Sequence, residues 1–147
     1  MTTKVTTWIN GILSFIIGLL GFSCTSHALE YGVPSADFTL DGEVCNENKE
    51  PLEIIQIVWK KGWKDGEGTM YWKNWHDTLY TNVDGKYYLN IPGDFPLEFH
   101  QVIASDTSGV YASDTINTSV TYSGGDGHWY YGESHLRADF VLKPQSK

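Results

Sequence analysis

The chain has 147 residues, of which 18 are acidic and ten are basic, and its formal net charge is −8. This length predicts a single domain with at most a leader segment before it. Arg137 is the only arginine and no stretch is strongly basic, which argues against nucleic acid as a partner, because the phosphate backbone is bound by clustered Lys and Arg.

The N-terminal segment has the pattern of a leader. Its first 20 residues carry one charge, at Lys4, and an apolar block runs from Ile9 to Leu20. The apolar region of a secretory signal peptide spans about 7–15 residues, whereas a membrane-spanning helix needs about 20. We therefore expect residues 1–23 to be a lipoprotein signal peptide.

Two cleavage sites compete after this leader. A cut before Cys24 lets the thiol receive lipid and tethers the protein to a bilayer through residues 24–34. A cut after Ala28 releases a secreted or periplasmic protein instead. Gly21 and Phe22 depart from the strict lipobox, but we expect acylation of Cys24, which makes the lipid bilayer a partner.

The first part of the mature chain alternates apolar and polar residues. In ADFTLDGEV, residues 36–44, one face is apolar and the other is polar, which predicts a half-buried strand. Gly42 falls on the apolar face, where it can admit a large neighbouring ring. LEIIQIVW, residues 52–59, is apolar on both faces and predicts a central strand.

WKKGWKDGEGTMYWKNW, residues 59–75, holds four of the six tryptophans. Gly62, Gly66 and Gly68 predict that its first part is a flexible loop. Exposed indoles can stack on sugar rings or anchor a protein interface, and Trp63 and Trp75 are the candidates for such a binding loop. The alternative is that the rings cap the core, which suits Trp59 and Trp72 best.

Later segments continue the strand pattern. Asp84-Gly85 predicts a tight hairpin between two strands, because glycine readily takes the positive φ of such a turn. IPGDFP, residues 91–96, predicts a break in pairing. Further strands are predicted over 97–105, 112–122 and 136–142. With no helical period in the mature chain, we predict an all-β protein, a single seven-strand β-sandwich over residues 35–143 with a tail at 144–147.

No pattern of catalytic or metal-binding residues stands out. The five histidines lack ligand spacing, and the only cysteines are Cys24 and Cys45. His76 and Asp77 are neighbours that a strand would point to opposite faces. GGDG, residues 124–127, lacks the lysine and the helix of a phosphate loop. We expect no catalytic residue, no metal and no cofactor, and therefore not an enzyme.

Several segments resemble the radical SAM-associated putative lipoproteins. They are YGVPSADFTLDGEV, EPLEIIQIVW, TLYTNVDGKYYL, VIASDTSGVYASDTI and GGDGHWYYG, between about Tyr31 and Leu142. The Asp84-Gly85-x-Tyr87 turn is similar to carboxypeptidase-regulatory-like and transthyretin-like sandwiches. The resemblance implies a prealbumin-like (Ig-like) sandwich on a lipid anchor, encoded beside a radical SAM enzyme, and no established activity.

We therefore expect a lipid-anchored protein in the inner or outer membrane of a Gram-negative cell envelope. Its predicted role is a non-catalytic binding or presentation domain associated with a radical SAM enzyme. Two alternatives stay open: a client that this enzyme modifies, or a glycan-binding accessory domain that uses the Trp-rich loop.

Overall fold

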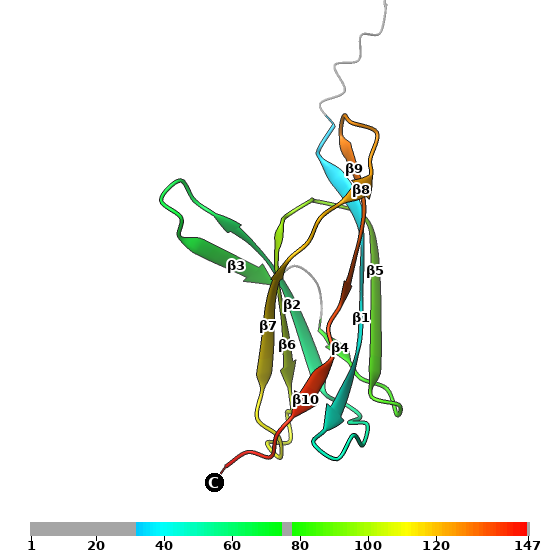
Figure 1. The fold of residues 1–147 in the computed structure, drawn as a ribbon, viewed down its shortest axis with the longest axis vertical. Coiled ribbons are helices and arrows are strands. Elements are labelled where there is room, and N and C mark those ends of the chain that lie inside the picture. The colour runs from blue at the N-terminus through cyan, green and yellow to red at the C-terminus, as the bar shows by residue number, and fades with distance from the viewer. Residues whose placement is uncertain (1–31, 75–77, 147) are drawn as a thin grey trace, which may run out of the picture. The chain divides into compact units, whose positions relative to one another are not determined.

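The computed structural model describes residues 32–74 and 78–146, which form two β-sheets packed as a sandwich (Figure 1). No helix occurs in these residues, so the all-β sandwich predicted from the alternating pattern is confirmed. Across the same described ranges, no helix is long and apolar enough to span a bilayer.

The first sheet has the order β10-β1-β9-β8, and β5 also pairs with β1. Its strands are β1 (Ser35–Asn46), β5 (Lys86–Asp94), β8 (Ser123–Gly124), β9 (Tyr130–Arg137) and β10 (Phe140–Leu142). The central strand β1 is antiparallel to β5 and parallel to β9 and β10.

The second sheet has the order β3-β2-β6-β7, and β4 also pairs with β2. Its strands are β2 (Gln56–Lys64), β3 (Met70–Asn74), β4 (Leu79–Tyr80), β6 (Phe99–Ser105) and β7 (Asp114–Ser119). All of its pairings are antiparallel.

The core lies between the two sheets and is built from alternate residues. On β1 the inward residues Phe38, Leu40 and Val44 are each at most 1% exposed, as the period-two pattern predicts. They meet inward residues of β2, β6 and β10, among them Ile57, Trp59, Val102, Ala104, Phe140 and Leu142. Burial of this apolar surface is the main stabilising contribution to the sandwich.

Gly42 is the position where the core needs the absence of a side chain. It lies directly opposite Tyr87 in the β1–β5 pairing, as expected of a glycine that admits a large ring. A Cβ at Gly42 would lie 1.9 Å from the carbonyl oxygen of Ala138 and 2.7 Å from the Tyr87 hydroxyl. That hydroxyl donates a hydrogen bond to the same carbonyl, and burial raises the pKa of Tyr87 well above its ordinary value.

Five loops have the same side-chain cap. In each, an Asp or Asn accepts hydrogen bonds from the backbone N–H groups two and four residues further on: Asn46, Asp65, Asn82, Asp106 and Asp126. These bonds satisfy amides that the turn takes out of the sheet ladder. Backbone N–H donors also lower the pKa of Asp65 and of Asp126.

The first part of the Trp-rich segment was predicted as a flexible loop, and this is wrong for residues 59–64. Residues 59–64 belong to β2, and Met70–Asn74 forms β3 as its antiparallel partner. Within 59–74, the part of this segment that the structure describes, only the turn from Asp65 to Thr69 lies outside the strands, and the Asp65 cap fixes it, with Gly68 at φ 86°.

Two strand boundaries also differ from expectation. The strand predicted to start at 52 starts at Gln56, because Ile54 takes a left-handed conformation at φ 62° and donates its N–H to Thr81. The break predicted at 91–96 occurs in part, because the β1–β5 register shifts between Ile91 and Asp94 and β5 ends at Asp94. β5 continues through Pro92 to Asp94, because β5 pairs on one side only and the missing N–H of Pro92 interrupts no second ladder.

The predicted strand over 136–142 is divided as well. β9 ends at Arg137 and β10 begins at Phe140, with the Ala138 N–H bonded to the carbonyl of Asp41. The strand predicted over 112–122 is shorter, since β7 covers Asp114–Ser119.

Candidate functional site

A buried ion pair closes one end of the core. Lys61 points inward from β2 and is 1% exposed, and its ammonium lies 2.7 Å from the carboxylate of Asp94 at the end of β5. The same ammonium donates to the carbonyl of Phe95 at 2.7 Å and lies 5.0 Å from the ring centroid of Trp59. Burial lowers the pKa of Lys61, and the nearby Asp94 opposes this shift. The pair therefore joins the two sheets where the core ends.

A neutral histidine lies beside this ion pair. The Trp59 indole donates from Nε1 to Nδ1 of His100 at 3.0 Å, and Nε2 of His100 donates to the Leu97 carbonyl at 2.8 Å. The Trp59 ring also stacks on Phe38, with centroids 4.4 Å apart. Because an indole N–H can only donate, Nδ1 must carry no proton. Burial lowers the pKa of His100 to about 4.

Stability is expected to fall when His100 is forced to take a proton. The pKa of His100 in the folded protein, about 4, lies below the ordinary 6.5. The contribution of neutral His100 to the free energy of unfolding is therefore complete above pH 6.5 and is lost as the pH falls toward 4. The loss approaches about 3 kcal/mol of unfolding free energy. We expect His100→Gln, which can accept from Trp59 and donate to Leu97 without titrating, to unfold in urea with a smaller difference between pH 7.5 and pH 4.5. If the stability difference between pH 7.5 and pH 4.5 is the same in His100→Gln as in the wild type, His100 is not the group whose protonation destabilises the fold.

An aromatic ledge, formed by Trp63 and Tyr71, extends beyond the buried ion pair. The two residues are directly paired across the β2–β3 hairpin, and their rings stack with centroids 5.8 Å apart and planes at 17°. Trp63 is two residues beyond Lys61, so it continues the inward-facing row of β2 past the place where β5 ends at Asp94. The rings are therefore 43% and 45% exposed. Figure 1 shows the hairpin extending away from the first sheet.

The four predicted tryptophans have different positions. Trp59 is 2% exposed in the core, and Trp72 lies half-buried over Gly62, where a Cβ would be 2.7 Å from its ring. Trp63 is exposed on the aromatic ledge, whereas Trp75 lies outside the described residues. Tyr71 was missed from the sequence, although recognising a turn at Asp65–Gly68 would have paired it with Trp63.

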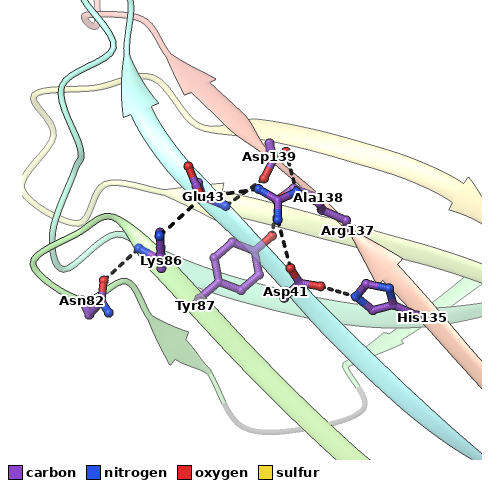
Figure 2. A network of polar contacts seen from close by, with 9 residues as sticks. All are labelled: Asp41, Glu43, Asn82, Lys86, Tyr87, His135, Arg137, Ala138 and Asp139. Atoms are coloured by element: carbon purple, nitrogen blue, oxygen red, sulfur yellow. Dashed lines mark hydrogen bonds and ion pairs between the residues drawn. The ribbon is translucent and has the colours of Figure 1, made fainter.

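A second polar cluster covers the outer face of the first sheet (Figure 2). In this outer charged network the Arg137 guanidinium contacts three carboxylates, at 2.9 Å to Asp139, 3.3 Å to Asp41 and 3.4 Å to Glu43. Lys86 lies 3.8 Å from Glu43, and His135 contacts Asp41. The residues come from β5, β1 and β9 and from the β9–β10 connection.

The outer charged network is best explained as a set of ion pairs that connect neighbouring strands. Each charged group drawn in Figure 2 has an ionic partner within the network, and the carboxylate of Asp139 raises the pKa of Arg137. A hollow of about 310 Å³ lies beside it, lined in part by Tyr88 and Asn82. Exposed ion pairs of this kind contribute little to stability, so the network fixes strand register more than it stabilises the fold.

Of the remaining sequence candidates, those within the described residues form no metal site. In residues 32–74 and 78–146, no three or more His, Cys, Asp or Glu side chains are placed together to hold a metal ion. The GGDG segment forms the β8–β9 turn, where Asp126 accepts from the N–H groups of His128 and Tyr130. Cys24, the predicted acylation site, and the pair His76 and Asp77 lie outside the described residues.

Comparison with known proteins shows a likeness in fold to dioxygenases. Catechol 1,2-dioxygenase from Pseudomonas arvilla C-1 has a TM-score of 0.50 and 12% identity over 80% of this chain, which spans 55% of that enzyme. For 3-chlorocatechol 1,2-dioxygenase from Rhodococcus opacus 1CP the TM-score is 0.46 with 11% identity, over 79% of this chain and 62% of the other. For the dioxygenase domain of a dioxygenase carbohydrate-binding protein fusion from Streptomyces sp. SirexAA-E the TM-score is 0.42. The identity is 20%, and the match covers 77% of this chain and 83% of the other.

These comparisons correct the expected family. No family model matches the chain, and no curated protein matches it. The likeness found is to the β-sandwich of catechol dioxygenases and not to radical SAM-associated lipoproteins, so that resemblance is wrong. At 12% identity the likeness establishes the sandwich fold and nothing about chemistry.

Proposed function

We propose that this chain is a non-catalytic binding domain, tethered to a bacterial cell envelope by lipid on Cys24, and that its aromatic ledge binds a sugar ring of a glycan. The observation that supports the ledge most directly is the near-parallel stacking of two rings that stay almost half exposed. The C–H face of a sugar ring is apolar and packs on such a surface, while its hydroxyl groups stay at the rim.

The surroundings of the aromatic ledge favour a small polyhydroxylated ligand. Asp65 lies in the turn that joins the two strands of the aromatic ledge, and its carboxylate can accept hydrogen bonds from sugar hydroxyl groups. Lys64, next to Trp63 in the chain, and Glu67, in the β2–β3 turn, are exposed and charged. A stable protein interface needs about 800 Å² on each partner with an apolar centre, which two rings bordered by charges do not supply.

Two buried polar contacts hold the base of the aromatic ledge. The Lys61–Asp94 pair and the Trp59–His100 bond fix β2 just before Trp63, so the ledge requires little ordering when a ligand binds. A site held in this way can gain useful affinity from few contacts.

We also infer that the sandwich is of the prealbumin-like (Ig-like) kind with seven principal strands. The support is that seven strands have five or more residues, namely β1, β2, β3, β5, β6, β7 and β9. The short strands β4, β8 and β10 extend the ladders between them.

The ligand proposal is tested by tryptophan fluorescence of the mature protein against an oligosaccharide panel. We expect at least one glycan to shift the emission, and Trp63→Ala or Tyr71→Ala to weaken its binding about fivefold, since one stacked ring contributes of the order of 1 kcal/mol. Trp129→Ala is the matched control, because Trp129 is 46% exposed on a different hairpin. Wild-type affinity in Trp63→Ala, or no response to any glycan, would contradict the proposal.

A further inference from the structure

A second group of exposed aromatic and apolar side chains lies where β1 begins. Trp129 and Tyr131, in the β8–β9 hairpin, are 46% and 52% exposed, and Val33, just before β1, is 72% exposed. Figure 1 shows this hairpin beside the first residues of β1, away from the C-terminus. The structure therefore leaves two amphipathic rings in water at this place, with an apolar residue close by.

Hydrogen bonds fix this hairpin to the start of β1. The N–H of Ser35 donates to the Trp129 carbonyl at 2.8 Å, and the Tyr130 hydroxyl donates to Asp37 at 2.9 Å. Gly132 allows the close approach, because a Cβ there would lie 2.0 Å from the carbonyl oxygen of Ser123. The hairpin tip therefore keeps a fixed position relative to the residue at which the preceding chain enters the sandwich.

We infer that the β8–β9 hairpin is the membrane-facing tip of the domain, with Trp129 and Tyr131 in the headgroup region of the bilayer. The inference rests on the proposed acylation of Cys24. Roughly ten residues separate Cys24 from Ser35, and they reach at most about 35 Å. The acyl chains thus keep the start of β1, and with it Trp129, close to the bilayer surface.

The chemistry of the tip matches the headgroup region. Trp and Tyr prefer the membrane interface, because the ring body packs on acyl chains while the N–H or O–H contacts water and headgroups. The acidic neighbours Asp126 and Glu133 lie in the same hairpin. These two acidic residues argue against attraction by anionic lipid. We therefore expect the hairpin to contact a membrane of zwitterionic phosphatidylcholine as strongly as one that contains anionic lipid.

The test uses the acylated mature protein, which begins at Cys24, purified from bacterial membranes and reconstituted into phosphatidylcholine vesicles with brominated acyl chains. Bromine quenches indoles that reach the acyl-chain boundary. We expect bilayer-dependent quenching that falls at least twofold in Trp129→Phe and is unchanged in Trp63→Phe, the matched exposed indole. Added phosphatidylglycerol should leave the quenching unchanged. Quenching that persists in Trp129→Phe would overturn the inference.

Intact mass of the same preparation separates the two possible failures. An acylated N-terminus at Cys24 without quenching of Trp129 overturns the membrane-facing tip and leaves the proposed anchor standing. An unmodified N-terminus at Leu29 overturns both. Glycan binding at Trp63 is measured independently, so loss of the anchor leaves the aromatic ledge to its own test.

Discussion

Gly42→Ala is expected to destabilise the sandwich by about 3 kcal/mol or more. A Cβ at this position would lie 1.9 Å from the carbonyl oxygen of Ala138, which is backbone and can move only with the β9–β10 connection. It would also push the Tyr87 hydroxyl, 2.7 Å away, out of its hydrogen bond to that carbonyl. Overpacking in a core usually costs about 1–3 kcal/mol, and here a buried hydrogen bond is lost in addition.

Urea unfolding measures this effect, with Gly66→Ala as the control, because no atom lies within 4 Å of a Cβ at Gly66. If Gly42→Ala does not fold, Tyr87→Phe tests the same contact with an expected loss of about 1–3 kcal/mol. Equal stability of the two alanine variants would show that β1 and β5 do not pair in this register.

Lys61→Met is expected to cost about 3–5 kcal/mol of unfolding free energy, because it leaves the carboxylate of Asp94 without its nearest cation. The Asp94 side chain is 9% exposed, so water replaces little of the lost interaction. The double variant Lys61→Met with Asp94→Asn removes both charges, and we expect it to recover a large part of the loss.

Lys64→Met on the same strand is the control for this prediction. Lys64 is exposed and lies 4.8 Å from the ring centroid of Phe99, so its replacement should cost about 1 kcal/mol or less. Thermal or urea unfolding of the wild type, Lys61→Met, the double variant and Lys64→Met measures these differences in stability. A double variant no more stable than Lys61→Met would show that the charge of Asp94 is not the cause.

The alternating pattern predicted the fold class and the role of one glycine. Phe38, Leu40 and Val44 share the buried face of β1, and Gly42 faces the Tyr87 ring. These features depend on neighbours along one strand and on its immediate partner, which a single sequence can specify.

Other local features were present in the sequence but were not used. Asp65, Asn82 and Asp106 are each followed three residues later by a glycine with positive φ, and each caps its own loop. Recognition of that spacing would have turned the predicted flexible loop after Trp59 into a hairpin and placed Tyr71 beside Trp63.

Long-range features could not be predicted. Asp41 and Glu43 meet Arg137 because β1 and β9, almost a hundred residues apart, are parallel neighbours. The passage of β5 through Pro92 likewise depends on its position at the edge of the sheet. The mistaken family resemblance has a related cause: strand alternation and an Asp-Gly turn are properties of a sandwich fold and do not identify a family.

The most direct test of the proposed function is the two-dimensional ¹H–¹⁵N spectrum of the indole N–H groups during titration with the glycan selected by fluorescence. We expect the Trp63 signal to move in proportion to occupancy while the Trp59 signal stays fixed, because that N–H is buried in its bond to His100. The Trp129 signal should also stay fixed. A stationary Trp63 signal, or equal movement of Trp63 and Trp129, would contradict a glycan site on the aromatic ledge.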